Sequence, residues 1–492
     1  MSLAAPDTNE IPRRRRLLIL AICCLSLLLV GLDSTIVNVA LPAIHRSFHA
    51  SLAGLQWVID AYTLVIASLL MLAGSTADRV GRRRVFQVGL LSFTFGSALC
   101  AVAPNLDTLI AARVIQAVGG SMLNPVAMSI VRNVFTDPRE RAQAIGLWGA
   151  MIGVSMGLGP VLGGALVDTV GWRYVFLVNV PIGLIACVLT VFYVPESRAD
   201  HARRIDPVGQ LLVIVGLASL TYAIIEGQSH GWSSAEIVTL FIVAVVCFGV
   251  LIRYELHRHE PLIDVRFFRS APFSGASITA VCAFASYGGF LFLNTLYLQE
   301  ARHYSAFHAG LCTLPIAVVT FFLAPLTGRF IARRGTRVPL LVAAAAFTVS
   351  PLLLLSLTIH TSLWVLISAY VIFGIALGLV NAPITNTAVS GMPSAQAGVA
   401  AAVASTSRQV GACMGIAVIG AVVGASSVHT FGPSFAHATH PGWWVIAGLG
   451  VIMLVVGAVT TTAWAQGTAV ATRERFLAAN PRQTAPSETV AA

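Results

Sequence analysis

The sequence predicts an all-α membrane protein with fourteen transmembrane helices, arranged as two six-helix bundles with two further helices between them. Three observations support this fold class. Of the 492 residues, 57% are hydrophobic and only 10% are charged, and the mean hydropathy is +0.84. Apolar runs of about 20 residues, the length that crosses a bilayer, recur along the chain. The arginines alternate between the two sides of these runs, and one loop motif recurs at a fixed offset.

The first apolar run follows four arginines and is too long for a cleaved signal peptide, so we expect it to remain as the first span. Applying a length of about 20 residues along the chain then gives the other spans. The fourteen expected spans are 17–42, 54–76, 85–103, 107–131, 142–167, 174–194, 208–226, 235–253, 273–298, 308–331, 338–358, 363–388, 397–424 and 443–465.

The arginines predict the orientation of the spans. All 30 basic residues are arginine. Twenty-five lie in the N-terminal segment, the even-numbered connections and the C-terminal tail, whereas three lie on the opposite side. Basic residues are enriched on the cytoplasmic side of membrane proteins, so both termini are expected to be cytoplasmic. Arg113 and Arg408 lie within spans, and the sequence does not assign a partner to Arg408.

An internal repeat relates the two halves of the chain. The loop GSTADRVGRRR at 74–84 and the loop GRFIARRGTR at 328–337 are separated by 254 residues. A duplicated bundle of this kind is typical of transporters built from repeated halves. The pairs that match at this offset are Gly74 with Gly328, Arg79 with Arg333, Gly81 with Gly335, Arg83 with Arg337, Gly120 with Gly374 and Gly157 with Gly411.

The repeat divides the chain into five expected segments. They are a cytoplasmic basic N-terminus (1–16), an N-terminal six-helix bundle (17–194), a linker with two additional spans (195–270), a C-terminal six-helix bundle (271–465) and a cytoplasmic tail expected to be disordered (466–492).

Three motifs are expected to take part in the conformational change of a transporter. In the first loop, glycines permit a tight turn, and Asp78 can cap a helix and pair with arginine. Span four reads LIAARVIQAVGG, with Arg113 near its middle, and span five reads GAMIGVSMGLGPVLGG, whose glycines permit close helix approach. The expected gating residues are Gly74, Asp78, Arg79, Gly81, Arg82, Gly153, Gly157, Gly159, Pro160 and Gly163.

These motifs, together with GLDSTIVNVALP in span one and WRYVFLVNVPIG at 172–183, resemble those of the major facilitator superfamily. The span-five string resembles the antiporter motif of its exporting members, and the whole chain is similar to the fourteen-span drug:proton antiporter branch. The resemblance implies the major facilitator fold and proton-driven export of amphipathic, cationic drugs or antibiotics across the bacterial cytoplasmic membrane. An exporter of a small polar metabolite, or a receptor or scaffold that has lost transport, are the alternatives.

Two acids lie inside predicted spans. A charge at bilayer depth costs about 2.5–3.5 kcal/mol even on the insertion scale, so a buried acid there is expected to have a function or a partner. Asp33 in span one and Asp60 in span two are expected about 9–12 Å below the outer surface on neighbouring helices. We expect them to share a cavity, to exchange a proton for substrate, and to have Arg113 as counter-ion. A purely structural role is the alternative for each acid.

The substrate pocket is expected between the inward faces of the two bundles. Aromatic rings there can stack on a cationic drug and amides can orient it. The expected pocket residues are Asn38, Gln56, Tyr62, Trp148, Phe284, Tyr287 and Asn294.

Other functional classes are disfavoured. The sequence has no glycine-rich phosphate loop, no metal-ligand spacing among its eight cysteines and no soluble domain, so we expect neither an enzyme nor a protein with a cofactor or bound metal. The expected partners are a small-molecule substrate, protons and membrane lipid, with no nucleic acid. We expect a monomer.

Overall fold

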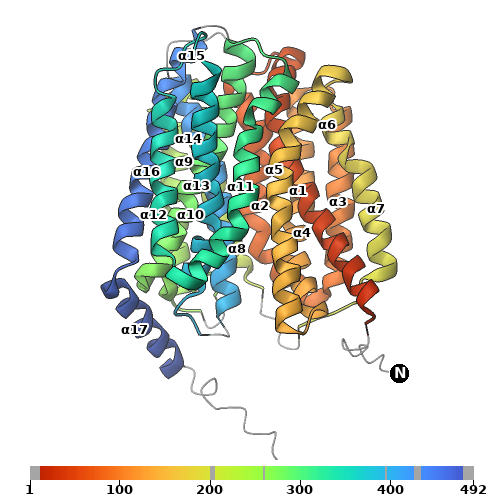
Figure 1. Ribbon diagram of the computed structural model, residues 1–492, viewed down its shortest axis with the longest axis vertical. Helices are drawn as coiled ribbons and strands as arrows, with labels where there is room; N and C mark the ends of the chain where they lie inside the picture. The colour runs from red at the N-terminus through yellow and green to blue at the C-terminus, as the bar shows by residue number, and fades with distance from the viewer. Residues whose placement is uncertain (1–10, 200–204, 259–260, 394–395, 426–433, 480–492) are drawn as a thin grey trace, which may run out of the picture.

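The computed structural model describes residues 11–199, 205–258, 261–393, 396–425 and 434–479, and their regular structure is helical (Figure 1). The helices are α1 (Arg13–Phe48), α2 (Leu52–Val80), α3 (Arg82–Val102), α4 (Leu106–Val134), α5 (Pro138–Thr169), α6 (Tyr174–Leu177), α7 (Asn179–Tyr193), α8 (Pro207–His230), α9 (Ala235–Glu255), η2 (Val265–Arg269), α10 (Ala271–Leu296), η3 (Tyr297–Ala301), α11 (Ala306–Arg334), α12 (Arg337–Leu353), α13 (Leu363–Val389), α14 (Ala397–Gly424), α15 (Phe435–Ala438), α16 (His440–Thr460) and α17 (Ala463–Ala479).

Thirteen helical segments among the described residues are long and apolar enough to cross a membrane. The other predicted span, 338–358, corresponds to α12, an apolar helix of 17 residues. Such a helix rises about 25 Å, which is shorter than the ~30 Å hydrocarbon core of a typical bilayer. The all-helical membrane fold is therefore confirmed, whereas the number of fourteen crossings stays a prediction.

Reporter fusions test the topology. We expect a reporter fused after residue 200 or after Asp264 to have cytoplasmic activity and one fused at His230 to have external activity, because α8 and α9 should cross the membrane as a hairpin. Alkaline phosphatase and green fluorescent protein fusions report opposite sides and serve as controls for each other. A cytoplasmic signal at His230 would remove the hairpin from the list of crossings.

Helix bounds repeat at the offset of the loop motif. Adding 254 to both ends of α2 gives both ends of α11. Both helices end at a glycine with positive φ, Gly81 at 128° and Gly335 at 78°, a conformation that glycine adopts readily. The duplication is thus visible in the backbone as well as in the sequence.

Polar residues start several helices as N-caps. Ser51 accepts a hydrogen bond from the backbone of Gly54 at the start of α2, and Asn105 forms a capping box with Thr108 at the start of α4. Such caps satisfy backbone N–H groups that have no partner inside the helix.

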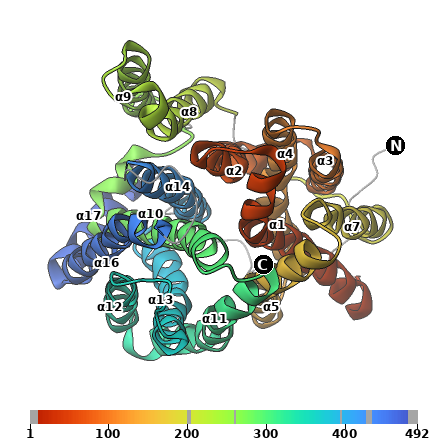
Figure 2. The same cartoon turned by 90° about the horizontal axis from the view of Figure 1, so that it is seen from above.

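Successive helices alternate in direction, so the arginine-bearing connections gather at one end, which we call the arginine-rich end. The start of α1 and the whole of α17 lie there (Figure 1). Seen along the helices, α1 to α7 form one group and α10 to α16 a second, while α8 and α9 stand outside, with α8 next to α2 and α14 and α9 beyond α8 (Figure 2). The two groups meet where α5 packs on α11 and α2 packs on α14.

The contact between α5 and α11 is closest away from the arginine-rich end. A Cβ atom added to Gly310 would lie 2.2 Å from the carbonyl oxygen of Pro160, and one added to Gly164 would lie 2.4 Å from that of Ala306. Only glycine permits such an approach. A Cβ added to Gly149, nearer the arginine-rich end, would meet nothing within 4 Å. The two helices therefore touch in one half of their length and not at Gly149.

The last helix, α17, packs beside the start of the second group. It buries one face, and the hydroxyl of Thr468 accepts a hydrogen bond from the backbone N–H of Ala271 at 2.9 Å. The ring of Phe476 lies 5.3 Å from that of Phe267 in η2. The residues predicted to begin a disordered tail are thus helical as far as Ala479. The rest of that predicted tail lies outside the described residues.

Candidate functional site

Asp33 lies in a buried cluster inside the first helix group. Its Oδ2 is 2.5 Å from Nη1 of Arg113, and the two side chains are 0% and 1% exposed. Its Oδ1 accepts hydrogen bonds from the amides of Gln116 at 2.8 Å and Asn179 at 3.2 Å. Four helices, α1, α4, α7 and the backbone of α2 at Val58, contribute to the cluster. Asp33 is therefore neutralised by a partner, as burial requires.

Tyr62 belongs to the same cluster. Its ring lies 4.1 Å from the guanidinium carbon of Arg113, while Phe176 lies 5.6 Å away. This is a cation–π contact, which stabilises the arginine at a buried site. The expectation was that Tyr62 lines the substrate pocket. The structure places it against Arg113 instead, because α2 turns this side of the helix toward α4.

Asp60 is in different surroundings, at the contact between the two helix groups. It is fully buried. Its Oδ1 accepts a hydrogen bond of 3.2 Å from Thr63 one turn further along α2, whereas Oδ2 has no hydrogen-bond partner among the described residues. The thiol of Cys413 on α14 faces the carboxylate. That sulfur lies 3.7 Å from the hydroxyl of Thr221 on α8.

The two acids therefore do not form one site in this structure. The expectation that Asp33 and Asp60 share a cavity rested on their similar depth on adjacent helices. Asp33 points into the first helix group, toward Arg113, and Asp60 points out of it, toward α14. Depth along a helix does not determine direction around it.

Gln56 lies on the same face of α2 as Asp60. Its amide donates hydrogen bonds of 3.0 Å to the backbone carbonyls of Ile416 and Ala417 on α14. The side chain was expected to line the pocket, but here it joins α2 to α14. The stripe formed by Gln56, Asp60 and Thr63 is thus a polar contact between the two helix groups.

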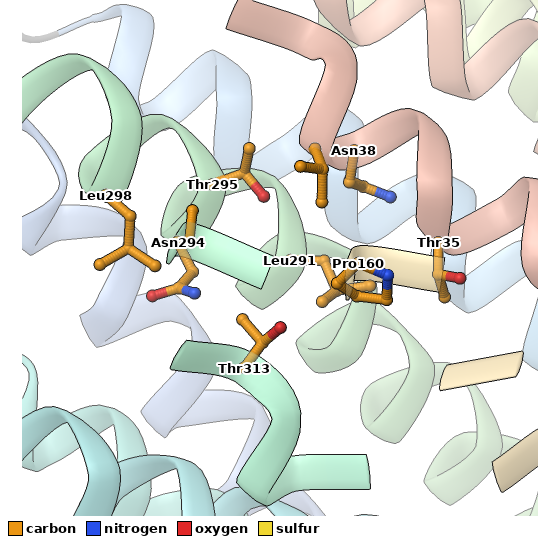
Figure 3. Close-up of a pocket in the computed structure, with 10 residues that line it drawn as sticks. Thr35, Asn38, Pro160, Leu291, Asn294, Thr295, Leu298 and Thr313 are labelled. Carbon is orange, nitrogen blue, oxygen red and sulfur yellow. The ribbon is translucent and has the colours of Figure 1, made fainter. Parts of the chain in front are cut away.

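A small cavity of about 10 Å³ lies between α1, α5, α10 and α11, which is room for about one water molecule. Figure 3 shows Thr35 and Asn38 on one side of it and Asn294, Thr295 and Thr313 on the other. Two polar atoms in it are buried and unpaired among the described residues, the Oδ1 of Asn38 and the Nδ2 of Asn294. The Oδ1 of Asn294 accepts a hydrogen bond of 2.5 Å from the hydroxyl of Tyr370. The cavity therefore offers one free acceptor and one free donor.

The other three expected pocket residues lie elsewhere. Trp148 is half-buried against the core of the first helix group. Phe284 and Tyr287 are on α10 and contact each other edge to face, with ring centroids 6.3 Å apart. None of the three lines the cavity of Figure 3.

The loop motif forms a small network at the arginine-rich end. Asp78 pairs with Arg82 at 2.9 Å rather than with its exposed neighbour Arg79. The expectation that Asp78 caps a helix is wrong for α3, because the oxygen that accepts from the backbone N–H of Arg83 belongs to Glu196, at 3.1 Å. Sequence reasoning missed Glu196, which follows α7 and lies 113 residues from the N–H group that it binds.

The glycines of α5 face two different helices. Added Cβ atoms on Gly153 and Gly157 would contact Phe321 and Ala317 of α11 at 3.4 and 3.2 Å. Those on Gly159 and Gly163 would overlap Thr35 and Ile36 of α1, at distances of 1.9 and 2.6 Å. Gly74 is less constrained, since its nearest neighbour is Pro125 at 3.8 Å, and Pro160 borders the cavity.

Arg408 on α14 is half-buried, and its Nη1 lies 3.3 Å from the hydroxyl of Thr385 on α13. Within the described part of the chain, no carboxylate forms an ion pair with it. No group of three or more His, Cys, Asp or Glu side chains there could hold a metal ion.

Comparisons with known proteins agree with this geometry. The profile of the Major Facilitator Superfamily matches residues 23–416. Multidrug resistance protein Stp of Mycobacterium tuberculosis is 37% identical over 86% of this chain and 79% of its own length. Multidrug efflux pump LfrA of Mycolicibacterium smegmatis is 34% identical over 85% of this chain and 82% of its own.

A solved structure has the same fold. The bacterial homologue of the human lysosomal transporter Spinster, in an inward-facing and unoccupied conformation, superposes with a TM-score of 0.62 at 18% identity. The match covers 94% of this chain and 99% of that one.

Proposed function

Because the chain belongs to the Major Facilitator Superfamily, we propose that it is a proton-coupled antiporter that exports drugs or antibiotics by alternating access. The observation that carries this proposal is Asp60, a buried carboxylate with one unpaired oxygen at the contact between the two helix groups. An acid at this depth is costly unless it takes up a proton or a cation. Because Asp60 lies at the contact between the two helix groups, gain or loss of its proton would act on the contact that must open and close during transport.

Asp33 has a supporting role in this proposal. Its ion pair with Arg113 holds α1 and α4 together inside the first helix group. We assign it to the rigidity of that group and to the position of α2, whose Val58 carbonyl accepts a hydrogen bond from Arg113 at 3.1 Å. Asp60 lies two residues beyond Val58, so the cluster positions the part of α2 that carries the titrating acid.

The names of the relatives support a substrate class. Two relatives are named for multidrug resistance and multidrug efflux, which supports an amphipathic drug or antibiotic. Asn38 and Asn294 carry a free acceptor and a free donor, which would meet a polar group of that substrate once the helices around the small cavity separate. The charge of Asp60 favours cationic compounds, as long as the carboxylate is ionised when substrate is bound.

Alternating access is supported by the uneven contact of α5 with α11. Added Cβ atoms would overlap the facing helix at Gly310 and Gly164 but would meet nothing within 4 Å at Gly149, which supports a conformation closed away from the arginine-rich end. With the arginine-rich end in the cytoplasm, the substrate enters from inside. Rocking of the two groups then closes that end and opens the other.

Replacing Gly157 with leucine should impair transport more than folding. Its added atoms would press on Ala317 of α11 and cost this conformation about 1–3 kcal/mol, which shifts the balance of the two states by about tenfold or more. Efflux rate and thermal stability measure the two effects. Gly448→Leu is the matched control, because an added Cβ there meets nothing within 4 Å. Wild-type rates in Gly157→Leu would mean that this glycine serves packing alone.

Transport in inverted membrane vesicles tests the proposed function. Respiring vesicles that contain the protein should accumulate ethidium, and a protonophore should stop accumulation. Vesicles with the same protein carrying Asp60→Asn are the control for other pumps in the membrane. If the wild type moves no tested drug in a proton-dependent way, the chain is an exporter of another metabolite or a membrane receptor.

A further inference from the structure

The inserted helix α8 covers the seam where α2 meets α14. Near the arginine-rich end, the amide of Gln210 donates a hydrogen bond of 2.6 Å to the backbone carbonyl of Ser68 on α2. Near the opposite end, Gln228 donates one of 2.9 Å to the carbonyl of Gly424 on α14. Figure 2 shows α8 beside both helices. The hairpin of α8 and α9 is therefore attached to both helix groups through α8. Asp60 lies on α2 between these two attachments, facing Cys413, which contacts Thr221 of α8.

Glu226 is the acid that α8 brings to this seam. Its Oε1 accepts a hydrogen bond of 2.9 Å from the indole of Trp57 on α2, and its Oε2 accepts one of 2.6 Å from Ser229. Trp57 precedes Asp60 by three residues, so the two are neighbours on successive turns, with Cβ atoms about 5–6 Å apart. Glu226 is thus linked through the Trp57 indole to the turn of α2 that precedes Asp60, on the side away from the arginine-rich end.

On the other side of Asp60, between Thr63 and the hydrogen bond of Gln210, the seam holds a cluster of apolar side chains. Ala67 of α2 packs against Val213 and Leu217 of α8, and Leu64 and Val410 join them. These side chains offer no donor or acceptor for a proton. Toward the arginine-rich end, these apolar side chains therefore bring no carboxylate to Asp60, whereas on the opposite side the seam leads to the carboxylate of Glu226.

The other titratable groups near Glu226 leave its charge uncompensated. On its own helix, the ring of Tyr222 lies 5.8 Å from that of Trp57, and His230 follows at 6.4 Å from Tyr222. From α9, Glu236 pairs with His230 at 3.4 Å. From α14, the group that faces Asp60 is Cys413. Among the described residues, no arginine or histidine forms an ion pair with Glu226.

We propose that Glu226 is the proton donor to Asp60, and that protons enter along the seam of α2, α8 and α14 rather than through the cavity of Figure 3. The Glu226 carboxylate takes a proton from external water. That O–H bond then breaks as the proton passes through a water molecule in the seam to the Asp60 carboxylate, and Glu226 is again ionised. The inference rests on the proposed proton-coupled export and gives the inserted hairpin a function in it.

The test separates proton delivery from substrate movement. Glu226→Gln keeps an oxygen acceptor for Trp57 but cannot carry a proton. We expect proton-driven ethidium transport in energised inverted vesicles to fall about a hundredfold, the lower end of what a missing proton-transfer group costs. Exchange of labelled for unlabelled substrate, which needs no net proton transfer, should remain at the wild-type rate. Glu226→Asp should recover part of the transport with a changed pH profile.

Two further variants complete the design. Trp57→Phe removes the hydrogen bond and keeps the acid, so it should transport nearly as the wild type does. Glu236→Gln is the matched control, since Glu236 lies at the same end of the hairpin and pairs with His230 rather than with Trp57. Unchanged transport and pH profile in Glu226→Gln, or equal damage by Trp57→Phe, would overturn the proposal while leaving export intact. A wild type without protonophore-sensitive transport would overturn the proposed function and this inference together.

Discussion

Replacing Asp60 with asparagine is expected to abolish proton-driven efflux of cationic drugs while the protein still folds and inserts. Asparagine has the same shape, and its oxygen can still accept the hydrogen bond from Thr63. The change removes a costly buried acid, so folding should not suffer. Without a group that binds and releases a proton, efflux should fall by about two orders of magnitude.

The rate of efflux measured as a function of pH in Asp60→Asn tests whether Asp60 takes up a proton during transport. Dicationic dyes should lose the most transport, because they need the most negative charge, and uncharged substrates should lose the least. Asp107→Asn is the matched control, since that acid is exposed at the start of α4. An unchanged pH profile for a dicationic dye would show that Asp60 is a structural acid.

Removing the charge of Arg113 should have the largest effect on stability. In Arg113→Met, the Asp33 carboxylate stays buried without its ion partner. Breaking a buried ion pair from one side costs about 3–5 kcal/mol. We therefore expect little folded protein after detergent extraction. Asp33→Asn should be milder, because Arg113 keeps the Val58 carbonyl and the ring of Tyr62.

The double variant identifies the cause of that loss. Asp33→Asn combined with Arg113→Gln leaves no unpaired charge, so its melting temperature should lie above that of Arg113→Met. Thermal unfolding followed by size-exclusion chromatography measures all three. If the double variant is the least stable of them, the cluster acts through packing and hydrogen bonds rather than through charge.

Much of the fold was predictable because membrane insertion leaves strong patterns in sequence. Apolar length and arginine placement depend only on composition along the chain, and the 254-residue offset relates α2 to α11 end for end. The length of α12 was less predictable. Apolar residues continue to 358, but the helix ends at Leu353, two residues after Pro351.

The candidate site was harder to predict, because it depends on which faces of the helices meet. Hydropathy does not distinguish the side of α2 that faces α4 from the side that faces α14. Tyr62 and Asp60 are two residues apart and were expected near one cavity, yet one contacts Arg113 and the other faces Cys413. The pairing of Asp33 with Arg113 could be predicted from the sequence, since each buried charge in a span requires an opposite charge.

Contacts from distant segments left no signal at all in the sequence. Glu196 and Glu226 read as ordinary loop or helix-end acids, and only the fold brings them to Arg83 and Trp57.

The position of α17 has a practical consequence for handling the protein. Because Thr468 and Phe476 pack on the start of α10 and on η2, the last helix is an integral part of the folded body. A shortened gene that stops at the end of α16 would expose Phe267 and leave the N–H of Ala271 without its acceptor. An affinity tag or a fluorescent fusion therefore belongs after residue 479, where it extends the chain without cutting into this contact.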